Sequence, residues 1–288
     1  MVTPFQPDGA LDLDGAGRLA TYLVDEQHND ALVINGTTGE SPTTTDAEKE
    51  TLLRAVVEAV GDRAKVVAGV GTNDTRHTIE LARSAEKAGA HGLLVVTPYY
   101  NKPPQPGLIR HFMTVADATG LPVLLYDIPH RTGTPITTES LCRLAEHSHI
   151  VGVKDAKGNL AETSWVLKRT DLAYYSGEDS LTLPMLAVGG VGVVGTSTHL
   201  TGVGTKQMIT AYEQGRVDEA LGLHRRMLPL YTGIFRTQGT ILVKAAMNAR
   251  GLPAGPVRSP LVDATEAEVA QLRDDCTEAG LPLPAGAA

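Results

Sequence analysis

Seven short runs rich in β-branched and other apolar residues recur along this 288-residue chain, each followed by a helical pattern. The runs begin at Ala31, Lys65, Gly92, Pro122, Ile150, Leu172 and Val191, and the terminal "MVTPF" adds an eighth. Their spacing of about 20 to 35 residues is that of one strand–helix unit. Continuous apolar strands that alternate with amphipathic helices predict a parallel sheet covered on its outer face.

Eight strand–helix units are the number that closes an α/β barrel, so we predict a (β/α)8 TIM barrel over residues 1–215. Strand patterns then stop, and a small C-terminal helical domain is predicted over residues 216–288 from "VDEALGLHRRMLPLYTGIF", "TILVKAAMNARG" and "ATEAEVAQLRDDCTEAG". A doubly wound open sheet is the alternative fold. Such a sheet usually has a glycine-rich dinucleotide turn after its first strand, and this sequence has none there.

One helix has clear signals at both ends. Thr45 and Glu48 have the spacing of a capping box, and Gly61 follows the last residue of the helical pattern. The apolar stripe expected on this helix consists of Leu52, Leu53, Val56, Val57 and Val60.

The composition excludes several classes of protein. A net charge of −8 argues against nucleic-acid and anionic-membrane partners, which usually bind a basic face. Cys142 and Cys276 are too few for a disulfide framework, and the nine histidines lack metal-ligand spacing, so we predict no metal site. Neither a membrane-spanning run nor a secretory signal is evident, and we expect a cytoplasmic protein.

The stretch "HIVGVKDAKG" contains an apolar strand pattern that reaches Lys154, where the pattern still calls for an apolar residue. Strand alternation puts Lys154 on the face opposite Val151 and Val153, so Lys154 points inward if the valines meet the surrounding helices. Burial there favours the neutral amine, which is a nucleophile toward a carbonyl. A lysine paired with a carboxylate at a strand end is an equally good interpretation of the spacing alone.

Two other strand ends offer partners for such an amine. Tyr126 ends "PVLLYDIP" on the inward face, where a phenol relays protons or simply fills the barrel. Thr37 ends "ALVINGT" with the same geometry and is able to hydrogen-bond that phenol, although threonine also suits a turn. Lys244 also has apolar neighbours, but it lies on a predicted helix where its long stem is expected to reach water.

Two glycine-rich turns, "GTTGES" and "YSGED", expose backbone N–H groups that suit a carboxylate. Arg131 in "IPHRTG" is able to clamp a second carboxylate, or to form a surface salt bridge. The strand-end set is completed by Tyr99, Tyr100 and Val194.

The motifs "GTTGES", "VTPYYNKP", "YDIPHRTG", "VGVKDAKG" and "SGED" occur in the order and spacing of a known family. The chain resembles the dihydrodipicolinate synthase (4-hydroxy-tetrahydrodipicolinate synthase) family. That family belongs to the pyruvate-dependent Schiff-base aldolases, which include N-acetylneuraminate lyase. The resemblance covers almost the whole chain, including "VKAAMNARGLPAGPVRSPL" in the helical extension.

The resemblance implies a role for each matched residue. Lys154 matches the lysine that forms an imine with pyruvate, Tyr126 the proton-relaying tyrosine, and Thr37 its hydrogen-bonded neighbour. Tyr100 matches a third relay member that reaches in from an adjacent subunit, which implies a homotetramer built as a dimer of dimers. The substrate-binding positions implied are Thr38 and Gly177 for the pyruvate carboxylate, Arg131 for the carboxylate of L-aspartate 4-semialdehyde, and Val194 in the substrate floor.

The reaction implied is condensation of pyruvate with the semialdehyde in the diaminopimelate route to lysine, without a metal or an organic cofactor. Arg131 and the double threonine of "GTTGES" favour this synthase over a sibling aldolase acting on a keto-deoxy sugar acid or hydroxy-oxoglutarate. A silent barrel that senses a keto-acid is a third hypothesis, disfavoured by the retention of Lys154, Tyr126 and Thr37.

Feedback inhibition by lysine in some relatives uses histidines and a glutamate near a subunit interface. Those positions here are Asp46, Lys49 and His77, beside a retained Asn73 and Tyr99. We therefore predict weak or absent inhibition by lysine.

Overall fold

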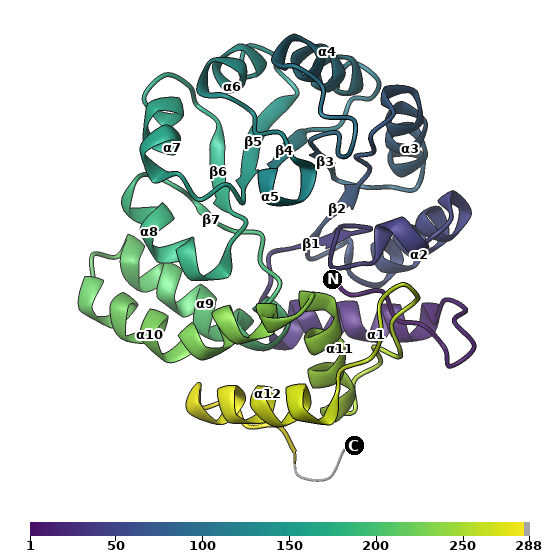
Figure 1. The fold of residues 1–288 in the computed structure, drawn as a ribbon, viewed down its shortest axis with the longest axis vertical. Helices are drawn as coiled ribbons and strands as arrows, with labels where there is room; N and C mark the ends of the chain where they lie inside the picture. The colour runs from purple at the N-terminus through teal and green to yellow at the C-terminus, as the bar shows by residue number, and fades with distance from the viewer. Residues whose placement is uncertain (285–288) are drawn as a thin grey trace. The chain divides into compact units, whose positions relative to one another are not determined.

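The computed structural model describes residues 1–284, which form helices and one seven-stranded sheet (Figure 1). The strands are β1 (Ala31–Ile34), β2 (Lys65–Gly69), β3 (Gly92–Val96), β4 (Val123–Asp127), β5 (Ile150–Asp155), β6 (Ala173–Ser176) and β7 (Gly192–Val193). The α-helices are α1 (Leu13–Thr21), α2 (Asp46–Val60), α3 (Thr75–Lys87), α4 (Gln105–Ala116), α5 (Pro129–Thr132), α6 (Thr138–Leu144), α7 (Leu160–Leu167), α8 (Thr182–Ala187), α9 (Thr198–Glu213), α10 (Val217–Gly233), α11 (Gly239–Ala249) and α12 (Glu266–Glu278).

The chain divides into two compact units. The first combines Met1–Val66 with Thr196–Ala288, and the second is Val67–Gly195. The second unit contains most of the sheet. The first contains β1, the helices α1 and α2, and the helices α9 to α12 near the C-terminus.

The strands follow one another in the sheet in the order of the chain, β1 to β7. The pairs from β2–β3 through β6–β7 are parallel. All seven apolar runs that follow the N-terminal segment therefore form strands as predicted. The eighth, Met1–Phe5, is not a regular strand: Met1 donates its amino group to the Val33 carbonyl, and the Phe5 backbone forms only an isolated bridge with Leu11.

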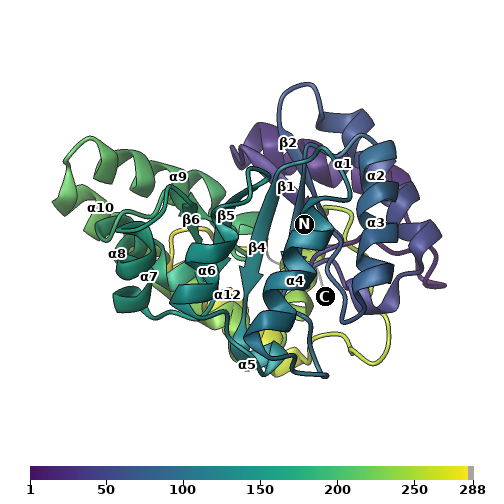
Figure 2. The ribbon, with the colours of Figure 1, turned by 90° about the horizontal axis from the view of Figure 1, so that it is seen from above.

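In the second unit, helices α3, α4, α6 and α7 follow one another along one side of the strands, and Figure 2 shows α4 and α6 beside β4. The strands are apolar and buried, as a covered parallel sheet requires. Residues with no exposed surface include Leu93, Val95, Val123, Leu125 and Val153 on the strands, with Leu108, Phe112 and Leu144 on the helices. The expected α/β architecture is confirmed for this part of the chain.

Helix α2 follows its sequence signals closely. Thr45 is the N-cap of a complete capping box with Glu48, and the helix ends before Gly61. Gly61 itself has right-handed dihedral angles (φ −64°), so it ends the helix without the left-handed cap that glycine often supplies. Four residues of the predicted stripe are buried, and only Val57 is partly exposed.

After β7, the described chain up to residue 284 contains only helices and connecting segments. Helix α10 packs against α9 and α12, and α11 packs against α12. Their buried apolar side chains include Met208, Met227, Leu230, Leu242, Met247 and Leu272. The three predicted C-terminal helices are confirmed, while the domain boundary at residue 215 stays a prediction. None of the helices within residues 1–284 is long and apolar enough to span a bilayer.

Gly152 gives a test of how tightly the sheet is packed. A Cβ atom at this position in β5 would lie 2.4 Å from the Ala173 carbonyl oxygen and 2.9 Å from Leu124 Cδ1. We predict that Gly152→Ala lowers the free energy of unfolding by roughly 1–3 kcal/mol, because backbone must move to accept the methyl group. Urea denaturation measures the change.

Gly222 supplies the matched control for this substitution. It lies inside α10, and a Cβ atom there would meet nothing within 4 Å. Gly222→Ala should raise the free energy of unfolding by roughly 0.5–1 kcal/mol, because alanine favours a helix interior over glycine. Equal effects of the two substitutions would contradict the close packing described for β5.

Candidate active site

The carboxyl ends of β4 and β5 bring Lys154 beside Tyr126. The two residues are direct partners in the parallel register, and the Lys154 Nζ lies 4.3 Å from the centre of the Tyr126 ring. Tyr126 is 5% exposed and Lys154 is partly buried. Within residues 1–284 the Lys154 amine makes no hydrogen bond and no ion pair, so the alternative of a lysine locked to a carboxylate is not what the structure contains.

The residues between and beside them follow the predicted alternation. Val153 and Asp155, on the opposite side of β5 from Lys154, are 0% and 2% exposed. Val151 is 45% exposed at the start of the strand, so the buried face begins only at Val153. The Asp155 carboxylate accepts hydrogen bonds from the Lys157 and Gly158 N–H groups and from the Thr163 hydroxyl, which fixes the turn directly after Lys154.

A second carboxylate, Asp127, follows Tyr126 and was not predicted as part of the site. It pairs in register with Asp155 and is 1% exposed. Its Oδ1 accepts the Ile136 N–H at 3.2 Å, and its Oδ2 lies 3.5 Å from the Lys157 ammonium. Burial raises the pKa of Asp127 to about 6, while the charge of Lys157 opposes that rise. The sequence does contain a signal for it, because an aspartate directly follows both Tyr126 and Lys154.

Glu178, in the predicted "YSGED" turn, is another titratable group near the lysine, although the sequence predicted a role for the backbone of this turn and not for its carboxyl. Burial raises its pKa, the neighbouring Asp179 adds to the rise, and the charges of His130, Lys154 and Arg131 oppose it. Its carboxyl therefore interacts electrostatically with both Lys154 and Arg131. Arg131 lies on the short helix α5 and is exposed, so its guanidinium is accessible to a ligand.

Gly177 does not have the free N–H group that the sequence led us to expect. Its N–H donates to the Asp155 carbonyl at 2.6 Å, and the Glu178 N–H donates to the Ser176 hydroxyl. A Cβ atom at Gly177 would lie 2.9 Å from Ala156 Cβ, so the glycine is required for close packing against the β5 turn. Val194, half-buried, donates its N–H to the Ser176 carbonyl at 2.8 Å.

Tyr100 lies in the loop between β3 and α4 and faces away from the chain. Its φ angle is +73°, an uncommon value for a bulky residue, and its side chain is 90% exposed. The ring is thus not packed against Tyr126 of the same chain. The neighbouring Tyr99 is 38% exposed.

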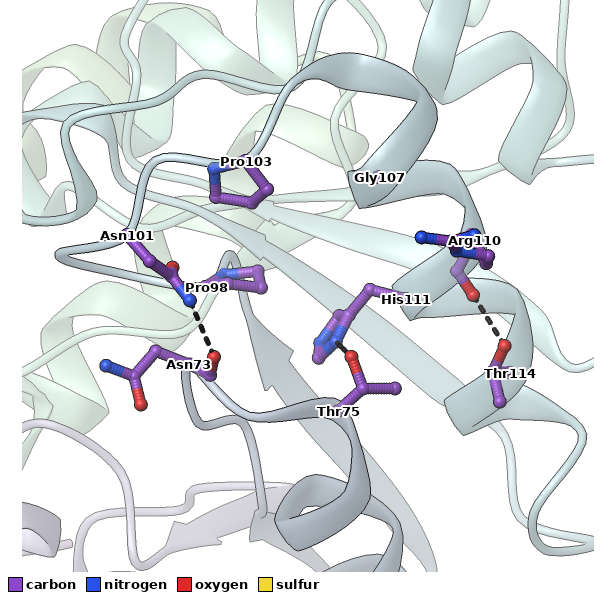
Figure 3. A pocket seen from close by; sticks show the side chains of 9 residues that line it. All are labelled: Asn73, Thr75, Pro98, Asn101, Pro103, Gly107, Arg110, His111 and Thr114. Carbon is purple, nitrogen blue, oxygen red and sulfur yellow. Dashed lines mark hydrogen bonds between the residues drawn. The ribbon is translucent and has the colours of Figure 1, made fainter.

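A cavity of about 330 Å3 borders this loop (Figure 3). Its walls include Pro98, Pro103 and Arg110 but neither Lys154 nor Tyr126. Asn101 donates to the Asn73 carbonyl across one side, and His111 shares a hydrogen bond with Thr75. Burial lowers the pKa of His111 to about 4, so this imidazole is neutral at pH 7.

Thr37 and Thr38 belong to the other compact unit, in the turn after β1. The Thr37 carbonyl accepts the Glu40 N–H, and the Thr38 hydroxyl lies 3.0 Å from that of Thr196. Both threonines are partly exposed, and their own N–H groups make no hydrogen bond within residues 1–284. This turn therefore keeps donors available for an anion, although its relation to Lys154 stays a prediction.

The expectation for Lys244 was wrong. It lies on α11 as predicted, but its side chain is only 2% exposed, and its amine pairs with Glu40 at 2.7 Å. Burial lowers the pKa of Lys244, and the contact with Glu40 opposes the fall. The helical pattern could not reveal this because the partner lies about 200 residues earlier in the chain.

Among residues 1–284, no three histidine, cysteine, aspartate or glutamate side chains gather in a way that could hold a metal ion.

A family model described as the dihydrodipicolinate synthetase family matches residues 1–279. The chain belongs to this family. It is 72% identical over 280 residues to the 4-hydroxy-tetrahydrodipicolinate synthase of Acidothermus cellulolyticus, covering 97% of this chain and 91% of the relative.

Other relatives agree with this assignment to the dihydrodipicolinate synthetase family. The 4-hydroxy-tetrahydrodipicolinate synthase 2 of Streptomyces coelicolor is 61% identical over 283 residues, which are 98% of this chain and 94% of that one. A crystal structure of DHDPS from Cyanidioschyzon merolae with lysine bound superposes with a TM-score of 0.95 at 42% identity. The superposition covers 98% of this chain and 96% of the Cyanidioschyzon merolae chain. The resemblance predicted from the motifs is confirmed, and the chain is an enzyme, a lyase of the class I aldolase type.

The raised pKa of Asp127 predicts a pH-dependent stability. The folded protein holds this proton more tightly than the unfolded chain, whose carboxyl titrates near 3.8. The contribution of Asp127 to stability should therefore fall by on the order of 2–3 kcal/mol as the pH rises from about 4 to about 6. We expect Asp127→Asn, which cannot titrate, to remove this loss, as measured by urea denaturation across that pH range.

Asp218→Asn is the control, because it makes the same change of charge at an exposed residue of α10. It should leave the slope between pH 4 and pH 6 as in the wild type. An unchanged slope in the Asp127 variant would show that this carboxyl does not hold its proton in the folded state.

Proposed function

We propose that this chain acts as a 4-hydroxy-tetrahydrodipicolinate synthase, condensing pyruvate with L-aspartate 4-semialdehyde in the diaminopimelate route to lysine. The observation that carries the proposal is the Lys154 amine, partly buried, without an ion pair, and 4.3 Å from the Tyr126 ring. The high identity to relatives of that name supports it.

In the proposed reaction the Lys154 amine attacks the ketone carbon of pyruvate to form a carbinolamine, which loses water to become an imine. Loss of a methyl proton gives an enamine, whose methylene carbon attacks the aldehyde carbon of the second substrate. The amino group of that substrate then attacks the imine carbon and expels Lys154. Hydroxy-tetrahydrodipicolinate is released, and no metal or organic cofactor takes part.

Tyr126 is proposed to carry protons between the carbinolamine and water, since its phenol stands beside the amine. Thr37 is proposed as its hydrogen-bonded neighbour, and Tyr100 as the third member of the relay. The exposed ring of Tyr100 supports a relay completed across a subunit interface. We propose that the protein is a homotetramer, arranged as a dimer of dimers and located in the cytoplasm.

Substrate binding is proposed at four positions. Thr38 offers a hydroxyl and a backbone N–H to the pyruvate carboxylate, while Gly177 contributes through its backbone shape and not through its occupied N–H. Arg131 is proposed to receive the carboxylate of the semialdehyde, and Val194 to line the substrate floor. The fold inferred for the whole chain is the TIM barrel over residues 1–215 with the helical domain after it. Weak or absent inhibition by lysine stays a prediction.

The imine is tested directly by borohydride reduction in the presence of pyruvate, followed by mass mapping of peptides. We expect a pyruvate adduct on Lys154 alone. Lys154→Ala should abolish the adduct and lower turnover by at least about a thousandfold, because the covalent route is lost. Lys102→Ala, at an exposed lysine of the same unit, should retain the adduct. Full turnover without Lys154 would rule out the mechanism.

The second substrate is tested at Arg131. Arg131→Ala should lower kcat/KM for aspartate semialdehyde by about a hundredfold, because a charge-assisted contact with a carboxylate is lost. The borohydride adduct with pyruvate should persist. Arg110→Ala removes an equally exposed arginine and should leave turnover near the wild-type value. An active Arg131 variant would favour a sibling aldolase that does not need this carboxylate contact.

A further inference from the structure

Glu40 is the most constrained residue of the turn that carries Thr37 and Thr38. Its φ angle is +55°, in the left-handed region that is unfavourable for residues other than glycine, asparagine and aspartate. Its side chain is 1% exposed. A residue in this conformation with a buried carboxylate persists only where the surroundings hold both the backbone and the charge.

Helix α11 supplies much of that hold. The Lys244 ammonium lies 2.7 Å from Glu40 Oε1. The backbone N–H of Arg258, in the segment that follows α11, donates to Glu40 Oε2 at 2.8 Å. One helical turn before Lys244, the Thr240 hydroxyl donates to the Thr38 carbonyl at 3.1 Å. Residues four apart lie on one face of a helix, so α11 holds the turn on both sides of Gly39.

The anchoring side is itself fixed. The Lys244 ammonium donates to the Pro256 carbonyl at 2.6 Å and lies 4.3 Å from the centre of the Phe5 ring. Arg258 lies over the same ring and pairs with Glu48 on α2. The Phe5 ring thus contacts two cations, Lys244 and Arg258, and both of these residues also bind the Glu40 carboxylate. The turn cannot shift without disturbing a buried charge network.

We infer that α11 acts as the positioning element for the carboxylate-binding turn, with Thr240 and Lys244 as positioning residues that hold the Thr38 backbone in its binding geometry. This inference rests on the proposed function, in which Thr38 contacts the pyruvate carboxylate. It assigns the C-terminal helical region a role in substrate affinity. Neither residue touches the substrate, and both act through the turn.

Thr240→Val tests the inference with the smallest change. It removes the hydroxyl that holds the Thr38 carbonyl while keeping the shape of the side chain. We expect KM for pyruvate to rise about fivefold with kcat nearly unchanged, because one hydrogen bond that orders the binding turn is lost. KM for the second substrate should stay the same.

Thr205→Val is the matched control. Thr205 is also buried, and its hydroxyl bonds to the hydroxyls of Tyr231 at 2.9 Å and of Thr201 at 3.2 Å and not to the turn that contains Glu40. It should lose a similar amount of thermal stability while leaving KM for pyruvate unchanged. Equal shifts of KM in the two variants would overturn the inference, because a general loss of stability would then explain both.

The ion pair is tested by Lys244→Met alone and in combination with Glu40→Gln. The single variant leaves a buried carboxylate without its cation, so its melting temperature should fall sharply. The double variant removes both charges and should recover part of that stability, yet KM for pyruvate should stay raised because α11 then holds the turn only through Thr240 and no longer through Glu40. Recovery of KM together with stability would contradict a positioning role.

Hydrogen exchange separates this inference from the proposed function. Peptides covering residues 36–42 should exchange faster in Thr240→Val than in Thr205→Val, whatever the enzyme turns over. If wild-type protein gives no pyruvate adduct at Lys154, the proposed function fails, while faster exchange still supports the hold of α11 on the turn. If the adduct forms but exchange and KM are both unchanged in Thr240→Val, only the positioning role fails.

Discussion

The pairing of β4 with β5 is the constraint on which the candidate site depends. Because the strands are parallel and in register, the last residues of each lie side by side, and Lys154 meets Tyr126 without help from any loop. A residue without a side chain, Gly152, lets β5 approach its neighbours closely two positions earlier. An amine presented from a rigid strand keeps its position better than one on a loop, which suits a group that must meet a carbonyl in one geometry.

In the second unit, the charged side chains of β4 and β5 lie on two opposite sides of these strands. Lys154 stands on one side of β5 without a paired anion, while Asp155 and Asp127 stand on the other side with hydrogen-bond donors and the Lys157 ammonium. The buried carboxylates are costly, and their donors come from the turns that follow the two strands. They therefore shape those turns without forming an ion pair with the Lys154 amine. The same separation explains why Lys244, which has its own carboxylate, is a poor candidate for the nucleophile.

The features that the sequence predicted well are those determined by local periodicity. The seven strands, the capping box of α2 and the shared side of Lys154 and Tyr126 all follow from repeats of two or 3.6 residues. The features that it missed depend on partners far away in the chain. Neither the occupied N–H of Gly177 nor the burial of Lys244 leaves a local trace, because each depends on a remote carbonyl or carboxylate. The strand expected at Met1–Phe5 failed for a similar reason, since hydrogen bonds to Val33 and His199 take the place of regular pairing.

The turn after β1 is made early and secured late. A ribosome delivers Glu40 some two hundred residues before Lys244 and Arg258. Until they arrive, the left-handed turn at Glu40 has only its local hydrogen bonds with Thr37 and Thr43. A nascent chain that ends before α11 therefore carries this segment in a loose form, with an acidic side chain still in water. The carboxylate of Glu40 can therefore find its cation and its backbone donor only after synthesis has passed residue 258.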